Sequence, residues 1–198
     1  MVDTPGFFDT QDASEVTEDE IAKSYQILAP GPHAFLIIHN VRNRFTAEQR
    51  NAAKRVRSVF GEKAANFCIL VFTNIDELEK KGSNIKDYVD RLKRDSPLKE
   101  VLDDYGGRYI GVNNDGTDVH KEKVLNELLS VIQKMVSETA NGFYTTFKFK
   151  EVADAVDKSK AQGHVIINPD GSITLIPEVK MILGAYLRQN LGRNSLIN

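Results

Sequence analysis

Apolar residues along the 198-residue chain fall into short continuous runs separated by longer amphipathic stretches. The short runs are typical of buried strands, and stretches with apolar residues three and four positions apart predict helices. The expected strands are 34–38, 67–72 and 108–112, and the expected helices are 16–28, 46–60, 85–94, 98–105 and 119–138. Thr46 and Gln49 fit a helix-capping box, and Gly61 is suited to end that helix. Strands alternating with helices predict an α/β fold with a mostly parallel sheet and helices on both faces.

The last third of the chain has a different pattern. Residues 151–162 are polar and predict a helical linker. Two apolar runs flank Asn168-Pro169-Asp170-Gly171, and proline second with glycine fourth suits a type I turn, so a β-hairpin is expected there. A final helix is expected over 178–190. These features divide the chain into a sheet domain (1–145), a linker (146–162) and a C-terminal hairpin and helix (163–198).

The first residues are turn-forming, since Asp3-Thr4-Pro5-Gly6 follows only Met1 and Val2. A strand usually runs about five or six residues. We therefore expect the chain to start inside a structural element, as a fragment, an alternative start or an incomplete gene model would.

Composition narrows the function classes. The formal net charge of −2 gives no indication of a nucleic acid or an anionic membrane as partner. The single cysteine, Cys68, cannot form an internal disulfide, which favours a reducing, cytoplasmic setting. The longest strongly apolar run, 67–72, is far too short for a transmembrane segment.

Three polar motifs follow the expected strands, at the strand ends where open parallel sheets bind ligands. The first, Asp3 to Gly6, suits a nucleotide switch: Asp3 would hold Mg²⁺ through water, and the backbone of Gly6 would approach a terminal phosphate. An ordinary turn is the alternative. The second and third motifs are Thr73-Asn74-Ile75-Asp76 and Asn113-Asn114.

The second motif is suited to reading guanine. The Asp76 carboxylate can accept from both the ring N–H and the exocyclic amine of guanine, and adenine presents no such pair of donors. Helix capping by Asp76, Asn74 or Thr73 is the alternative. Asn113 and Asn114 would line the same base pocket, or would simply begin a loop.

Four segments occur in the order VDTPGFFDT, PGPHAFLIIHNVRNRFTAEQRNAAKRVRSVFGEKA, VFTNIDELE and GGRYIGVNN. In this order they resemble the GIMAP family of immunity-associated GTPases, also seen as plant avirulence-induced proteins, over about residues 1–145. The resemblance implies a P-loop GTPase fold of the septin-like branch that binds GTP or GDP with Mg²⁺. It implies that Asp3 and Gly6 form the switch motif, that Asn74, Ile75 and Asp76 line the guanine pocket, and that Asn114 is a later base contact.

The chain departs from the family pattern at three points. Asn74 stands where a basic residue is usual. No glycine is followed by lysine, so the phosphate loop G-x-x-x-x-G-K-[ST] does not occur in these 198 residues. The C-terminal hairpin and helix match no family feature that the motifs define.

Arg44 lies in the family segment and is a candidate catalytic residue acting across a dimer, while a solvated surface charge is the alternative. Phe7 and Phe8 follow Gly6 where a water-positioning glutamine would stand, so hydrolysis is expected to be slow even with a phosphate loop restored. Two hypotheses lead: a GTP-binding switch that assembles with itself or related GTPases, and a truncated pseudo-GTPase acting as a nucleotide-free interaction module. An unrelated doubly wound enzyme is the third.

Overall fold

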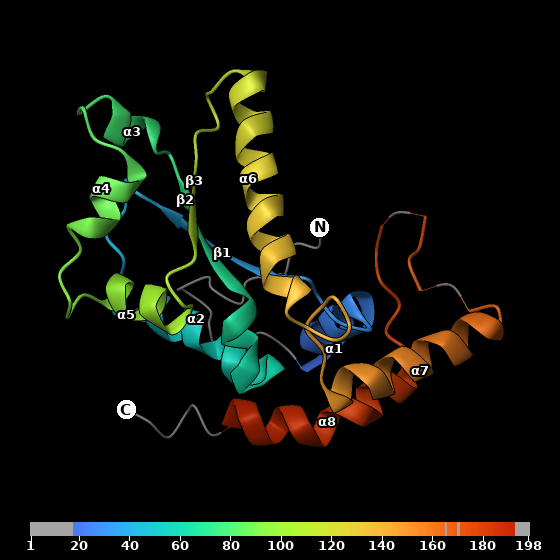
Figure 1. The fold of residues 1–198 in the computed structure, drawn as a ribbon. Helices are drawn as coiled ribbons and strands as arrows, with labels where there is room; N and C mark the ends of the chain where they lie inside the picture. The colour runs from blue at the N-terminus through green and yellow to red at the C-terminus, as the bar shows by residue number, and fades with distance from the viewer. Residues whose placement is uncertain (1–17, 165, 170, 193–198) are drawn as a thin grey trace. The chain divides into compact units, whose positions relative to one another are not determined.

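The computed structural model describes residues 18–164, 166–169 and 171–192, so Asp3 and Gly6 lie outside the described residues. The described chain forms two compact units (Figure 1). The sheet unit consists of His33–Arg57 and Glu62–Phe143. The helical unit consists of the described residues up to Pro32, Ser58–Gly61, and the described residues from Tyr144 onward.

The sheet unit is built on three parallel strands in the order β1-β2-β3, as the pattern predicts. They are β1 (Phe35–Asn40), β2 (Cys68–Thr73) and β3 (Tyr109–Val112). The central strand is the most deeply buried, and Ile69, Leu70 and Phe72 have no exposed surface. Burial on both faces explains why β2 is continuously apolar.

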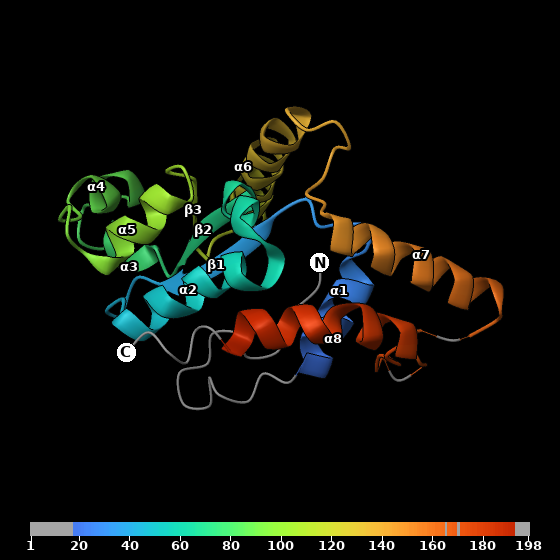
Figure 2. The same ribbon diagram turned by 90° about the horizontal axis from the view of Figure 1, so that it is seen from below.

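Helices lie on both faces of this sheet (Figure 2). Helix α2 (Ala47–Phe60) and α5 (Pro97–Asp104) pack together, since the hydroxyl of Tyr105 donates to the carbonyl of Ala53 at 3.1 Å. The opposite face carries α6 (Asp118–Ser137), which contacts β3. The remaining helices of the unit are a 3₁₀-helix (Glu62–Phe67), α3 (Asp76–Glu79) and α4 (Ile85–Asp90).

The predicted start of α2 is confirmed. The backbone N–H of Gln49 donates to Thr46 Oγ1, and the backbone N–H of Thr46 donates to Gln49 Oε1, as in a capping box. The apolar stripe expected along α6 is half-buried at each of its positions, which are Val124, Leu128, Val131, Ile132 and Met135, and no residue of this helix is fully buried. Leu125 and Leu129, which lie beside this stripe, are about half exposed.

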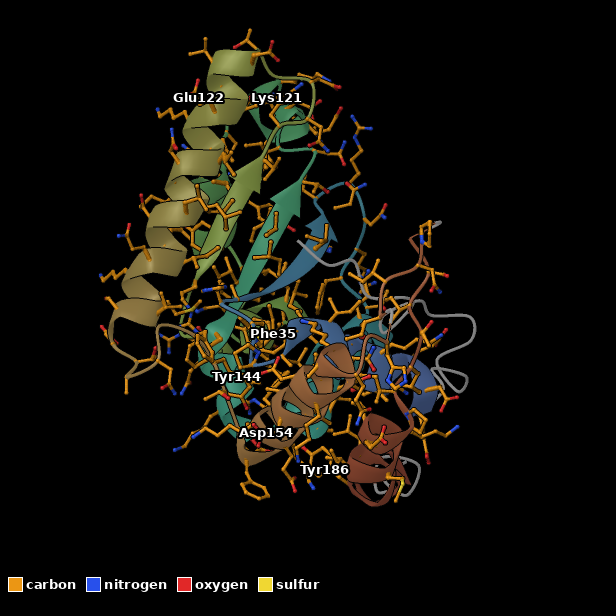
Figure 3. The ribbon with its side chains drawn as sticks, turned by 90° about the vertical axis from the view of Figure 1, so that its right-hand side faces the viewer. Phe35, Lys121, Glu122, Tyr144, Asp154 and Tyr186 are labelled. Atoms are coloured by element: carbon orange, nitrogen blue, oxygen red, sulfur yellow. The ribbon has the colours of Figure 1, made fainter. Side chains whose placement is uncertain are left out.

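The helical unit consists of α1 (Glu18–Leu28), α7 (Phe147–Ala161) and α8 (Pro177–Gly192), which contact one another. Tyr25 of α1 packs on Phe149 of α7 with ring centroids 4.4 Å apart. Asp154 on α7 and Tyr186 on α8 mark these two helices in Figure 3. The predicted linker helix is therefore a core element, with Phe149, Val152 and Val156 buried.

The predicted hairpin is present as a minimal antiparallel bridge between Ile167 and Ile173. The backbone N–H of Gly171 donates to the carbonyl of Asn168 at 2.9 Å, which closes the expected four-residue turn. The buried Gln26 of α1 anchors the segment that follows, because its side chain bonds the backbone of both Thr174 and Ile176. None of the helices described has the length and apolar character needed to span a bilayer.

Candidate functional site

The carboxyl ends of the three strands are level with one another. Asn40 pairs with Thr73, and Thr73 pairs with Val112. The backbone N–H of Val41 continues this alignment by donating to the carbonyl of Thr73 at 3.1 Å. The segments that follow the strands therefore emerge at one edge of the sheet, as predicted for the second and third motifs. The N-terminal end of α6, marked by Lys121 and Glu122, lies at the same edge (Figure 3).

The turn after β2 has a special backbone. Asn74 has a φ of 60°, in the left-handed region that asparagine tolerates better than most residues. The side chain of Ile75 is buried and anchors the turn against β3. Gly111 is closely packed against this turn, because a Cβ at that position would lie 3.1 Å from Ile75 Cδ1 and the isoleucine would have to shift.

Asp76 is a buried carboxylate at the end of the central strand, with only 8% of its surface exposed. Its Oδ2 lies 2.8 Å from Lys80 Nζ and 3.5 Å from Arg42 Nη2. The hydrogen bond from Lys80, with the charge of Arg42 in support, lowers the pKa of Asp76. No side-chain hydrogen bond caps α3 at its first turn, so Asp76 is not serving as a helix cap. The two neighbouring cations therefore favour the ionised form of this carboxylate.

Glu77 completes a cluster of four charges at this edge, which we call the strand-end cluster: Arg42, Asp76, Glu77 and Lys80. Glu77 Oε1 lies 2.8 Å from Arg42 Nη2 and 3.0 Å from Lys80 Nζ. Two cations thus face two carboxylates. Arg42 comes from the loop after β1, and the other three residues come from α3 and its C-terminal end.

The asparagines after β3 lie close to the same helix. Asn113 Nδ2 is 3.4 Å from Glu79 Oε2 of α3, and Asn113 Oδ1 accepts from the backbone N–H of Asp115 at 2.9 Å. The side chain of Asn113 therefore shapes the loop, which agrees with its interpretation as the beginning of a loop. Asn114 is exposed.

Arg44 is exposed on the loop between β1 and α2. No ion pair involves it among the residues that the structure describes. Its two alternatives, a residue acting across a dimer and a solvated charge, both require such exposure.

Two other reactive side chains are buried and take no part in the strand-end cluster. Burial raises the pKa of the Cys68 thiol to about 12, which makes it an inert core residue. His39 is enclosed by Phe45 and Phe72, and neither ring nitrogen has a hydrogen-bond partner among the described residues. Within 18–164, 166–169 and 171–192, no three histidine, cysteine, aspartate or glutamate side chains gather as a metal site.

Sequence reasoning missed Arg42, Glu77 and Lys80 as members of the site. Arg42 is the first of several basic residues between positions 42 and 57, and such a run is ordinarily a solvated surface. The signal available for Lys80 was its spacing, because residues four apart on a helix are neighbours and favour a Glu/Asp–Lys pair.

A three-stranded parallel sheet with flanking helices defines a mixed α/β protein. The profile of the AIG1 family matches residues 1–163. The chain therefore belongs to the AIG1 family, also known as the GIMAP or immune-associated nucleotide-binding family.

Individual relatives come from plants and animals. Immune-associated nucleotide-binding protein 9 of Arabidopsis thaliana is 31% identical over 82% of this chain and 47% of its own length. Immune-associated nucleotide-binding protein 7 of the same plant is 26% identical over 98% of this chain and 63% of its own length. GTPase IMAP family member 8 of Homo sapiens is 30% identical over 99% of this chain and 28% of its own length.

These alignments correct one expectation and set one limit. The last two relatives align over nearly the whole chain, so the C-terminal hairpin and helix do have counterparts in the family. The chain spans less than two thirds of the length of each of these relatives.

Proposed function

We propose that this chain carries the base-recognition half of a GTP-binding site, and that the whole protein is a nucleotide-dependent switch with slow GTP hydrolysis. In this proposal guanine lies at the carboxyl ends of the strands, with Asp76 accepting its two N–H donors. Asn114 lies on the neighbouring loop as a later contact. Asp3 and Gly6 would serve Mg²⁺ and the terminal phosphate, but they lie outside the described residues.

The observation that carries the proposal is the state of Asp76. A carboxylate is costly to bury unless it is paired, and here two cations keep it ionised at the edge where open parallel sheets bind ligands. The cations approach Oδ2, and each carboxylate oxygen has more than one acceptor site. Asp76 can therefore still accept hydrogen bonds from a ligand.

The names of the relatives support the same assignment. The Arabidopsis proteins are named as nucleotide-binding and the human protein as a GTPase. Guanine fits the chemistry of an ionised double acceptor, because it offers two parallel N–H donors. An ionised carboxylate has no donor to offer the acceptor ring nitrogen of adenine.

The test is an NMR titration of the purified chain with GDP, and with ADP as the comparison. Because no phosphate-loop motif occurs in the 198 residues, we expect a dissociation constant for GDP of about a millimolar. GDP should shift the amide signals of residues 73–77 and 113–115 at concentrations where ADP does not.

The Asp76→Asn variant should weaken GDP binding by about ten- to a hundredfold, because the amide places a donor against a donor. The affinity of this variant for xanthosine diphosphate should fall less than its affinity for GDP, or should rise. Asp104→Asn is the matched control, since Asp104 lies 3.5 Å from Arg57 Nη2, the same separation as between Asp76 and Arg42. Equal responses to GDP and ADP would refute guanine recognition, and no response to either nucleotide would favour the nucleotide-free interaction module.

Assembly with a second copy or with a related GTPase is the further part of the proposal. Exposure of Arg44 on a loop is compatible with a guanidinium delivered to a neighbouring subunit.

A further inference from the structure

We propose that Arg42 is a positioning residue that fixes the Asp76 carboxylate relative to the sheet, so that Asp76 meets guanine in one orientation. This role rests on the proposed function. It assigns a specificity-determining task to a residue of the loop after β1 that does not itself need to touch the base.

The geometry distinguishes Arg42 from Lys80. Lys80 follows Asp76 by four residues at the C-terminal end of the same short helix, so it moves with the carboxylate that it pairs with. Arg42 belongs to a different loop, and its Nη2 reaches both Asp76 Oδ2 at 3.5 Å and Glu77 Oε1 at 2.8 Å. Arg42 therefore ties α3 to the end of the neighbouring strand.

Helix α3 needs such external ties. It has four residues and no side-chain cap, and isolated helices of this length are unstable in water. The described contacts that hold its polar face are the Arg42–Glu77 bond on one side and the 3.4 Å contact between Asn113 and Glu79 on the other. Asp76 lies at the start of this helix, so its orientation depends on these ties.

Both cations approach the same oxygen of Asp76. Lys80 and Arg42 each pair with Oδ2, which restricts rotation of the carboxylate about its Cβ–Cγ bond. A bidentate contact with two parallel donors requires that rotation to be correct, since hydrogen bonds weaken steeply away from linear geometry. The pair of cations thus preorganises the acceptor for guanine.

The experiment compares Arg42→Gln, Arg42→Lys and Lys80→Gln in the whole chain, with GDP and ADP as the probes. Two quantities are measured by NMR for each variant. The first is the dissociation constant for each nucleotide, and the second is the pKa of the Asp76 carboxyl group without nucleotide, followed through its carboxyl carbon signal. Arg50→Gln is the matched control, because Arg50 pairs with Glu100 at 3.0 Å elsewhere on the sheet unit.

Arg42→Gln should weaken GDP binding by about two- to fivefold, the range for a partly exposed ion pair, with ADP unchanged. Arg42→Lys should recover part of this loss. Lys80→Gln should raise the pKa of Asp76 more than Arg42→Gln does, because Lys80 is its strongest partner, but should weaken GDP binding less. If the two cations acted through their charge alone, GDP affinity would fall further in Lys80→Gln than in Arg42→Gln, in line with the larger rise in the pKa of Asp76.

Glu77→Gln gives a second check, because it weakens the anchor that Glu77 provides to Arg42 and Lys80 while both cations that pair with Asp76 stay in place. This substitution should weaken GDP binding. The double variant Arg42→Gln/Glu77→Gln should bind GDP as well as Arg42→Gln alone does. GDP affinity that is unchanged in Arg42→Gln, or reduced no more than in Lys80→Gln, would overturn the positioning role while leaving the Asp76 assignment intact. If the unaltered chain does not prefer GDP over ADP, the proposed function fails and the role of Arg42 fails with it.

Discussion

Two tyrosine hydroxyls complete the C-terminal end of α2, and their removal should cost measurable stability. Tyr25 donates to the carbonyl of Val59 at 2.7 Å, and Tyr144 donates to the carbonyl of Phe60 at 2.6 Å. Because α2 ends at Phe60, both carbonyls lie in the last turn of the helix, where the tyrosine hydroxyls reach them. Burial raises the pKa of Tyr25 far above neutrality, so its hydroxyl remains a donor.

The expected magnitude follows from what each substitution leaves behind. Tyr25→Phe preserves the packing of the ring but leaves the buried Val59 carbonyl without its donor, which costs about 1–3 kcal/mol. Tyr144→Phe likewise keeps its ring and removes the hydrogen bond to the carbonyl of Phe60. With a urea dependence of about 2 kcal/mol per molar, a loss of about 1.5 kcal/mol lowers the midpoint by about 0.7 M.

The assay is urea denaturation followed by circular dichroism at 222 nm, which suits a chain without tryptophan. Tyr109→Phe is the matched control, because its ring packs edge-on against Phe72 and no hydrogen bond of its hydroxyl is found in the described part of the chain. Midpoints for Tyr25→Phe and Tyr144→Phe within about 0.2 M of the control would refute the reasoning.

Two further predictions concern residues near the sheet edge. Burial lowers the pKa of His39 below the usual 6.5, so in acid the unfolded chain binds more protons and stability should fall as pH drops below about 6.5. His39→Phe should reduce that loss, His33→Gln should not, and an unchanged pH dependence in His39→Phe would contradict the explanation. In a chain extended by a phosphate loop, GTP turnover per molecule should rise with protein concentration and become low and concentration-independent in Arg44→Ala; equal turnover in both would show that Arg44 is only a surface charge.

Local signals in the sequence were sufficient for much of the fold. The strands are continuous apolar runs because they are buried on both faces, and the Thr46–Gln49 capping box involves residues only three apart. Such patterns depend on neighbours in the chain, so they can be read without knowing the tertiary structure. The parallel sheet and the position of Asp76 at a strand end followed directly.

Features that depend on distant residues could not be predicted in this way. Gln26 bonds the backbone of Thr174 and Ile176, which are 148 and 150 residues away. A polar residue on an amphipathic helix is ordinarily assigned to the solvated face, and nothing local marks Gln26 as an exception. The same holds for α7, whose polar composition predicted a linker although Phe149, Val152 and Val156 pack into a core.

The loop after β1 shows the same limit within the candidate site. Arg42 and Arg44 belong to one basic run, and their composition and spacing do not distinguish them. The structure does so, because Arg42 reaches the carboxylates of Asp76 and Glu77 while Arg44 is exposed without an ion pair in the described chain. The difference depends on α3 being folded against the loop, a contact between residues 34 and 35 positions apart. The two arginines of this loop therefore have different surroundings, and the substitutions proposed for each test whether Arg42 positions Asp76 and whether Arg44 acts on a partner subunit.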